Sequence, residues 1–269
     1  MSPGEHRIRL TLHYDGSGFA GWQVQPGERT VQGELEAALG RLTDSAARVI
    51  AAGRSDTGVH ATGQVVGATV AQKWQPEELR RALNAVLPHD MWIESAAATH
   101  DAFHARYDAR ARGYVYRLGT AAVSRSPFFR RWCWPLALPL PLDVLNDAAR
   151  RFIGDHSFRA FAKAGQPERG ERCMVYHAEW REWHPAGVTF HVVANRFLHH
   201  MVRYMVGTMT DVARGRRDAS EIDALLRGDD ALETSPPAPP TGLFLTRVYY
   251  DGDELIAGDN EHEILSRQR

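Results

Sequence analysis

Cysteine is scarce in this sequence, whose 269 residues include only Cys133 and Cys173. Two cysteines are too few for the disulfide framework of a small secreted domain, and the N-terminus shows no charged start followed by an apolar stretch. No run approaches the roughly 20 apolar residues that cross a bilayer. These absences exclude a disulfide-rich scaffold and a membrane-spanning helix, so we expect a protein of the reducing cytoplasm.

Lysine is almost missing, since only Lys73 and Lys163 of the 32 basic residues are lysines. Planar guanidinium groups suit phosphate oxygens and stack on bases, whereas a genomic preference for arginine codons would explain the same composition. The formal net charge of −1 hides an uneven distribution, because His104–Arg131 holds seven arginines against one acid, Asp108. We call this segment the basic stripe and expect it to contact RNA through Arg110, Arg112 and Arg130.

The hydrophobic periodicity predicts the order β-α-β-β-α-β twice. In the first half the expected strands are 8–14, 46–52, 63–70 and 91–98, and the expected helices are 31–42 and 76–87. In the second half the expected strands are 114–118, 174–182, 188–195 and 243–250, and the expected helices are 142–153, 198–214 and a short helix over 219–227. Gly154 is expected to be the residue that follows the end of the helix 142–153.

This repetition predicts an α+β fold of two tandem ferredoxin-like halves. Mainly antiparallel sheets are flanked by helices, with an active-site cleft between the halves. We expect an N-terminal half over 1–105, a C-terminal half over 106–250 and a loose acidic tail over 251–269, where six acids accompany two arginines. Sheets of this order often serve as RNA platforms, but a fold alone assigns no function.

Asp56 is the first candidate for chemistry, within the stretch "AAGRSDTGVHATGQVV". A Ser-Asp-Thr-Gly run is typical of a turn, because aspartate caps turns and glycine accepts a positive φ. A turn requires neither Arg54 nor the polar Thr57 and His60 nearby. A guanidinium neighbour favours the charged carboxylate, which is suited to act as a nucleophile.

The expected helix 198–214 carries a polar face beside its methionines. His199, Arg203, Gly207 and Thr210 follow helical spacing and should share that face. Glycine there would permit the close approach of a neighbouring backbone, although glycine is about 1 kcal/mol less favourable in a helix than alanine. An arginine in this position needs an anion, which is either a structural carboxylate or Asp56.

A third feature is "ARGYVYRLG", where Tyr114 and Tyr116 alternate on a strand between Arg112 and Arg117. Aromatic side chains flanked by arginines can stack on a base while the cations bind phosphates. We expect Tyr116 to belong to the core and Tyr114 to be available. The histidines show no metal-ligand spacing apart from the adjacent pair at 199 and 200, which is a poor chelate on a helix, so we expect no metal.

Successive motifs along the chain resemble those of the tRNA pseudouridine synthase A family over residues 7 to 250. They are "YDGSGFAGWQVQ", "AAGRSDTGVHATGQVV", "FHARYDARARGYVYRL", "NRFLHHMVRYMVGTM" and "GLFLTRVYY". The resemblance implies isomerisation of uridine to pseudouridine at positions 38, 39 and 40 of the tRNA anticodon stem-loop. It further implies that no metal or organic cofactor takes part and that a homodimer binds the tRNA.

The resemblance also implies roles for single residues. Asp56 is the expected nucleophile, and Tyr114 the tyrosine that stacks on the uracil. Arg203 is expected to pair with the catalytic carboxylate, Arg54 to fill the gap left by the everted nucleotide, and Leu245 to lie near the base. Ser55 stands where the family usually has threonine, a loss of one methyl group that should leave the chemistry intact.

Two other functions compete with this interpretation. Asp56-Thr57-Gly58 is the triplet of aspartic proteases, but that chemistry needs two carboxylates sharing a proton, and the chain has no second such triplet. A non-catalytic RNA-binding module would use the same sheets and basic stripe. Substitution of Asp56 distinguishes such a module from an enzyme, because the enzyme should lose its activity while RNA binding survives.

Overall fold

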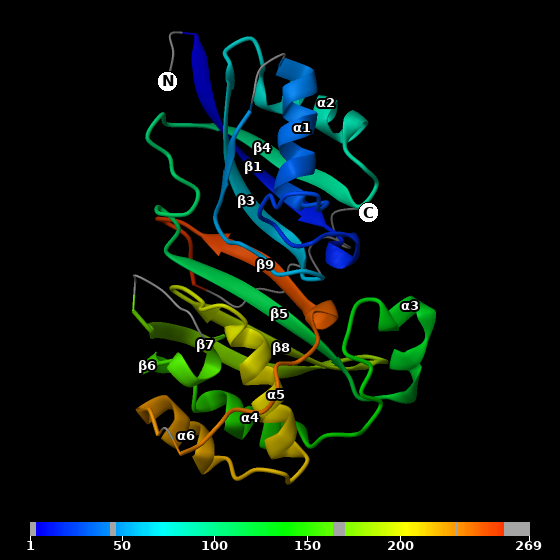
Figure 1. Ribbon diagram of the computed structural model, residues 1–269, viewed down its shortest axis with the longest axis vertical. Helices are drawn as coiled ribbons and strands as arrows, with labels where there is room; N and C mark the ends of the chain where they lie inside the picture. The colour runs from blue at the N-terminus through cyan, green and yellow to red at the C-terminus, as the bar shows by residue number, and fades with distance from the viewer. Residues whose placement is uncertain (1–3, 44–46, 164–169, 230, 256–269) are drawn as a thin grey trace. The chain divides into compact units, whose positions relative to one another are not determined.

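A computed structural model describes residues 4–43, 47–163, 170–229 and 231–255. Two compact units make up the chain, one built on Met1–Arg110 together with Arg247–Gly252 and the other on Ala111–Thr246 (Figure 1). We call them unit 1 and unit 2. Most of the acidic tail expected over 251–269 lies outside the described residues.

Unit 1 contains the first β-α-β-β-α-β series. Its elements are β1 (Glu5–Tyr14), α1 (Val31–Thr43), β2 (Val49–Ala51), β3 (His60–Ala71), α2 (Pro76–Val86) and β4 (Met91–Thr99). Strand β1 pairs antiparallel with β3 on one side and with β4 on the other, and β2 pairs antiparallel with the outer edge of β3. The resulting order, β4-β1-β3-β2, is that of a ferredoxin-like sheet.

The core of unit 1 lies between this sheet and the helices α1 and α2, which lie side by side on one face (Figure 1). Alternate residues of β1 are fully buried, as their spacing predicted. Helix α2 begins with proline, whose fixed φ suits the first turn, and Glu77 and Glu78 follow there near the positive end of the helix dipole. The buried side chains at the centre of this core are Ile8, Leu10, Leu12, Leu35, Leu39, Leu79 and Leu83.

Unit 2 repeats the order with one added strand. Its main elements are β5 (Ala111–Gly119), α3 (Pro127–Arg130), α4 (Leu142–Arg150), β6 (Gly154–Ser157), β7 (Arg172–Trp183), β8 (Gly187–Ala194), α5 (Met201–Ala213), α6 (Ser220–Arg227) and β9 (Leu243–Tyr249). The sheet order is β9-β5-β8-β7-β6, with β5, β8, β7 and β6 paired antiparallel. The α+β class with two ferredoxin-like halves is therefore confirmed.

Two predicted helix boundaries in unit 2 are wrong. Helix α4 ends at Arg150, and Gly154 opens strand β6 with φ +115° instead of following a longer helix. Helix α5 begins at Met201, after His200 with φ +65°, so His199 precedes the helix and does not share its face with Arg203. The apolar spacing continues through Leu198 because that side chain is buried from the preceding loop.

The proline-rich segment 235–239 packs along helix α5, and we call it the proline strap. An ideal Cβ on Gly207 would lie 2.1 Å from the Pro236 carbonyl oxygen, so only glycine allows this approach. The close backbone contact predicted at Gly207 is thus confirmed. Within the described parts of the chain, no helix has the length and apolar character needed to span a membrane.

Candidate active site

Asp56 lies in a short loop of unit 1 between β2 and β3, and we call residues 53–58 the Asp56 loop. The Asp56 carbonyl accepts a hydrogen bond from Val59 N (3.1 Å), and Gly58 has φ +77°. The predicted turn is therefore present, with glycine at the position that requires a positive φ. The Asp56 side chain is partly exposed and Arg54 is exposed, so neither is a core residue.

The start of the Asp56 loop is held by Gln64, whose side chain is fully buried. Its amide nitrogen donates to the Gly53 carbonyl (2.8 Å), while its amide oxygen accepts from Gly53 N (3.3 Å). These two bonds replace the strand pairing that ends at Ala51, so that the backbone leaves the sheet with its polar groups satisfied.

Ser55 is held from two sides. Its hydroxyl shares a 2.8 Å hydrogen bond with Tyr14 Oη, and its carbonyl accepts from Trp22 N (3.0 Å). Burial raises the pKa of Tyr14 to about 12, so this hydroxyl keeps its proton. An ideal Cβ on Gly21 would lie 2.8 Å from Ser55 O, so the segment "FAGW" lies directly against the Asp56 loop. These contacts fix the backbone directly before Asp56.

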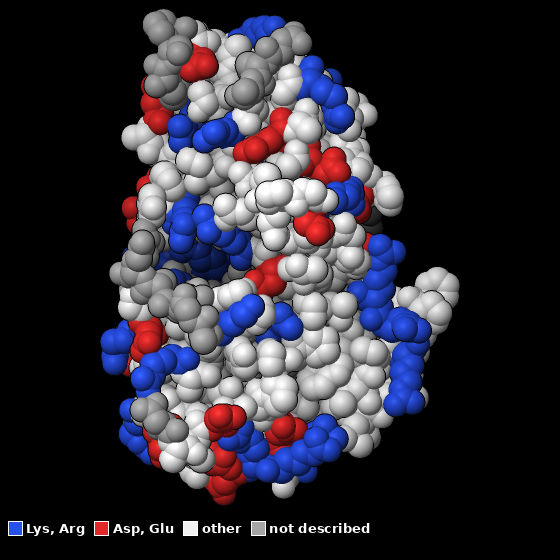
Figure 2. Space-filling view, in the orientation of Figure 1, with Lys and Arg blue, Asp and Glu red and all other residues white. Residues whose placement is uncertain are grey.

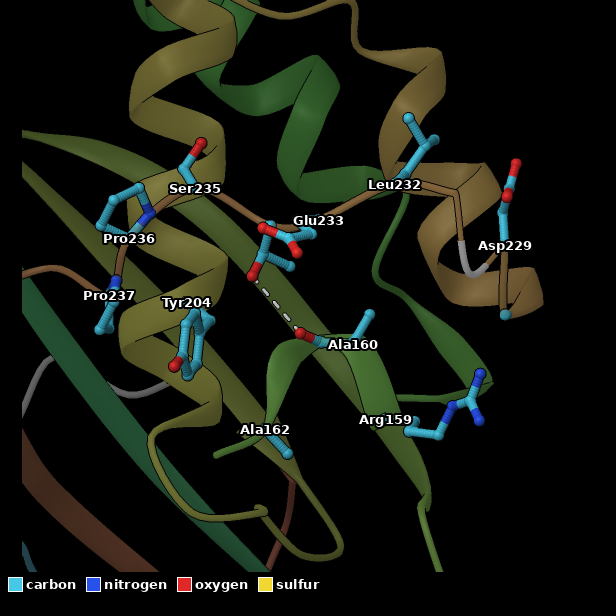
Figure 3. Close-up of a pocket in the computed structure, with 12 residues that line it drawn as sticks. Arg159, Ala160, Ala162, Tyr204, Asp229, Leu232, Glu233, Ser235, Pro236 and Pro237 are labelled. Atoms are coloured by element: carbon cyan, nitrogen blue, oxygen red, sulfur yellow. Dashed lines mark hydrogen bonds between the residues drawn. The ribbon is translucent and has the colours of Figure 1, made fainter. Parts of the chain in front are cut away.

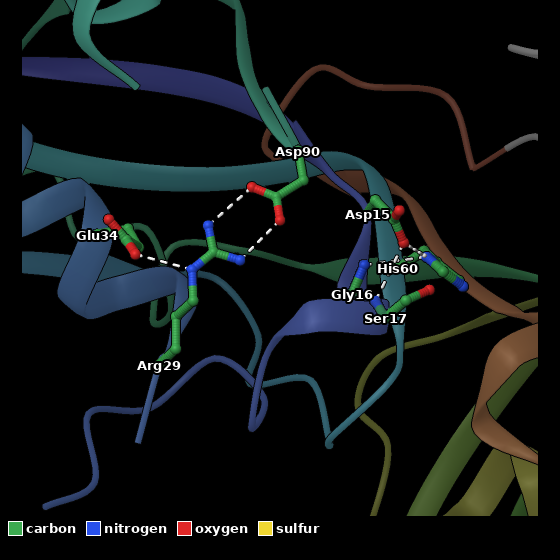
Figure 4. A network of polar contacts seen from close by, with 7 residues as sticks. All are labelled: Asp15, Gly16, Ser17, Arg29, Glu34, His60 and Asp90. Atoms are coloured by element: carbon green, nitrogen blue, oxygen red, sulfur yellow. Dashed lines mark hydrogen bonds and ion pairs between the residues drawn. The ribbon is translucent and has the colours of Figure 1, made fainter. Parts of the chain in front are cut away.

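Buried His60 opens strand β3 and ties it to the turn after β1 (Figure 4). The Gly16 amide donates to His60 Nδ1 (3.0 Å), and Asp15 Oδ1, which accepts from Ser17 N (3.0 Å), lies 3.2 Å from the same ring nitrogen. An ideal Cβ on Gly16 would meet the Val59 carbonyl at 2.0 Å. The Asp56 loop is therefore supported at its C-terminal end as well.

Arg29, Glu34 and Asp90 form a second set of polar contacts, which holds the start of the turn after β1 (Figure 4). Arg29 donates to both carboxylate oxygens of Asp90 (2.7 and 2.9 Å) and to Glu34 Oε1 (2.9 Å). Hydrogen bonding from Arg29 lowers the pKa of Asp90. The Asp90 carbonyl accepts from Asp15 N (2.9 Å), so this paired carboxylate and the His60 contacts share one backbone segment.

Tyr114 occupies strand β5 of unit 2, opposite Val192 of β8. Its ring contacts Phe197 edge-on with centroids 4.9 Å apart, and the side chain is only partly buried. Tyr116 is fully buried, and its hydroxyl donates to the Pro239 carbonyl (2.8 Å). The prediction that Tyr116 belongs to the core is thus confirmed, and Tyr114 is the less buried of the two.

Arg203 is anchored in the first turn of α5. Its Nε donates to the Ala238 carbonyl (2.7 Å), while Ala238 N donates to the Arg203 carbonyl (2.9 Å). Pro239 of the same proline strap is bound by Tyr116, so the strap joins α5 to β5. Nothing in the spacing of these prolines along the sequence indicates which helix they contact.

The remaining candidates occupy different surroundings. Leu245 is buried in β9, and Arg112 donates through Nη1 to the Asn195 carbonyl (3.1 Å). Arg130 is exposed on α3. Arg110 of unit 1 lies 3.4 Å from Asp251 in an exposed ion pair, which water and salt screen. Of the predicted RNA contacts, Arg110 and Arg130 are exposed, whereas Arg112 is partly buried.

Unit 2 also contains a cavity of about 400 Å³ (Figure 3). Tyr204, Arg159, Pro236 and Pro237 line it, and Thr234 Oγ1 donates to the Ala160 carbonyl (3.4 Å) at its wall. None of the candidate site residues lines this cavity, although Tyr204 directly follows Arg203.

Comparison with known proteins identifies the family. The family described as tRNA pseudouridine synthase matches residues 11–108 and 148–251. The chain is 42% identical over 245 residues to tRNA pseudouridine synthase A of Moorella thermoacetica, covering 90% of this chain and 99% of the relative. It is 39% identical over 246 residues to the protein of that name from Geobacillus sp. (strain WCH70), covering 91% and 98%. The chain therefore belongs to the tRNA pseudouridine synthase family.

Proposed function

We propose that this protein isomerises uridine to pseudouridine at positions 38, 39 and 40 of the tRNA anticodon stem-loop. Membership of the tRNA pseudouridine synthase family supports the reaction and the substrate. The observation that carries the residue assignment is the bracing of the Asp56 loop by Gln64 and Tyr14, which positions one partly exposed carboxylate.

In the proposed reaction the target nucleotide leaves the stacked stem, at a cost of a few kcal/mol. Tyr114 stacks on the everted uracil, and Arg54 fills the space left in the stem. Asp56 is the nucleophile, Arg203 pairs with its carboxylate, and Leu245 contributes apolar surface near the base. The bond between N1 of the uracil and carbon 1 of the ribose breaks, the uracil turns, and carbon 5 bonds to the same ribose carbon. The carbon 5 proton passes to water and N1 takes up a proton, so the composition of the nucleotide is unchanged and no metal or organic cofactor is required.

We further propose that the protein acts as a homodimer in the cytoplasm. Both cysteines are buried thiols, which suits a reducing compartment. Sedimentation equilibrium of the purified protein would test the dimer, and a monomer at all concentrations that support activity would contradict it.

Substitution of Asp56→Asn tests the nucleophile and separates the enzyme from a non-catalytic RNA-binding module. The variant should bind unmodified tRNA as the wild type does and form no pseudouridine, measured by filter binding and by tritium release from labelled uridine. Wild-type turnover by this variant would refute the role of Asp56. Absence of product with the wild-type protein would favour the binding module.

Arg203→Ala provides the matching test in unit 2. Because its proposed partner is a carboxylate and not a phosphate, the substitution should lower the isomerisation rate more than the tRNA affinity. Equal losses in rate and affinity would assign Arg203 to RNA binding instead.

A further inference from the structure

Phe128 is the most exposed large apolar side chain among the described residues, with 87% of its surface accessible. It lies on α3, a single helical turn that interrupts the connection from β5 to α4. Aromatic side chains gain much from burial, so a phenylalanine kept in water at this level points to a binding surface. No role in the fold of unit 2 accounts for it.

Phe128 is held in place by a well-anchored turn. Ser126 caps α3 by accepting from Phe128 N (3.4 Å), and the ring of Phe129 contacts Trp183 edge-on with centroids 5.9 Å apart. Buried Cys133 donates through Sγ to the Phe129 carbonyl (3.3 Å). The side chain is thus presented by a fixed backbone, which lowers the entropy lost when a partner binds.

The connection between this turn and strand β5 is equally close. Gly119 N donates to the Trp134 carbonyl (2.8 Å), and Trp134 N donates to the Arg117 carbonyl (3.0 Å). An ideal Cβ on Gly119 would lie 2.2 Å from the Ser124 side chain. Phe128 is therefore carried by the C-terminal end of the strand whose earlier part holds Tyr114.

The charged residues that neighbour Phe128 in the sequence have one sign. Arg125, Arg130 and Arg131 lie within three positions of it and are exposed, and the chain has no aspartate or glutamate between Asp108 and Asp143. Basic side chains form a band over the region of α3 at the right of Figure 2. Arginines that flank an exposed ring match a partner that offers both phosphates and flat bases.

We propose that Phe128 stacks on an unpaired base of the tRNA, while Arg125, Arg130 and Arg131 bind the adjoining phosphates. The inference rests on the proposed tRNA substrate and adds a nucleotide contact separate from the target uridine. Tyr114 and Gly119 are five residues apart on β5, about 16 Å at the rise of a strand, and Phe128 belongs to the connection after Gly119. We therefore assign the two rings to different nucleotides. A second copy of this chain is the other candidate partner, and a change in self-association distinguishes it from tRNA.

Phe128→Ala and Phe128→Trp test the stacking, with Ile153→Ala as the control for an exposed apolar side chain elsewhere in unit 2. Loss of one stacked base should raise the Kd for unmodified tRNA roughly 5- to 150-fold in the alanine variant. The tryptophan variant and the control should bind like the wild type. The kcat at saturating tRNA should not change in any of them, because Phe128 lies outside the reacting groups.

The salt dependence of binding separates stacking from charge. Phe128→Ala removes no charge and should keep the wild-type slope of log Kd against log salt. Arg130→Ala should reduce that slope by roughly the contribution of one phosphate contact. An unchanged Kd for Phe128→Ala would overturn the proposal. Loss of self-association in that variant by sedimentation would also overturn it, in favour of a protein partner. If the wild-type protein binds tRNA but forms no pseudouridine, the proposed function fails while the binding comparison still decides the role of Phe128.

Discussion

Arg203 and Ala238 are joined by two hydrogen bonds, one through the guanidinium (2.7 Å) and one between their backbones (2.9 Å). The position of this arginine therefore depends on the proline strap as well as on helix α5. Because Tyr116 binds the next strap residue, Pro239, a disturbance of β5 reaches the same guanidinium. Residues without any contact to substrate can thus change the proposed chemistry.

Gly207→Ala should disturb Arg203 from four residues away. The new methyl group would lie 2.1 Å from the Pro236 carbonyl, and this backbone contact can be relieved only by moving the proline strap. Overpacking of this kind costs about 1–3 kcal/mol of unfolding free energy. We expect a lower thermal midpoint and a lower rate of pseudouridine formation, measured by calorimetry and tritium release.

Gly33→Ala is the matched control, since Gly33 lies in helix α1 of unit 1 and its ideal Cβ meets the Thr30 hydroxyl at 3.0 Å, not a backbone atom. Alanine also gains about 1 kcal/mol of helix propensity over glycine. This variant should keep both stability and rate. A Gly207→Ala protein as active and as stable as Gly33→Ala would show that the strap yields without moving Arg203.

Tyr116→Phe should weaken the attachment of the proline strap to β5. The Pro239 carbonyl would lose its buried donor, at a cost of about 1–2 kcal/mol in unfolding free energy. We expect kcat to fall more than tRNA affinity, because the strap positions Arg203. Tyr176→Phe removes an exposed hydroxyl and should change neither; equal effects in the two variants would contradict this role of Tyr116.

Ser55→Ala and Ser55→Thr test the bracing of the Asp56 loop. Alanine removes the 2.8 Å hydrogen bond to Tyr14 and leaves a buried hydroxyl with one partner fewer, at a cost of about 1–1.5 kcal/mol in unfolding free energy. We expect a lower rate as well, because the Asp56 loop is then held by fewer contacts. Threonine keeps the hydroxyl and should keep the rate. The measurement is single-turnover pseudouridine formation, and a slow threonine variant beside a fast alanine variant would refute the assignment.

Asp90→Asn should reduce stability in a pH-dependent manner. The bond from Arg29 lowers the folded-state pKa of Asp90 below its usual 3.8, so the stabilisation is complete above about pH 5 and is lost as pH falls through the folded pKa. Because the Arg29 side chain is 38% exposed, we expect about 1 kcal/mol at pH 7. Urea unfolding of both proteins at pH 7 and near pH 3 checks this, and a difference that grows toward low pH would contradict it.

Much of the local structure could be predicted from the sequence. Alternating apolar residues in β1 and the helical spacing of apolar residues in α1 indicate which side of each element faces the core. Both patterns consist of residues only a few positions apart along the chain. The position of Tyr114 nearer the basic stripe predicted that Tyr116 is the more buried of the two tyrosines, and helical spacing predicted the close approach at Gly207. The predicted helical position of His199 is wrong, because the apolar spacing extends to Leu198, three residues before α5 begins at Met201.

The sequence by itself therefore determined the repeated order of elements, the turn at Asp56 and the family motifs, since each is written in residues close together along the chain. Only the tertiary structure decided that Gln64 holds Gly53, that the proline strap binds Arg203 and Tyr116, and that Phe128 faces water. These contacts join residues up to 123 positions apart, and their formation depends on how the elements pack, a property that no local spacing encodes.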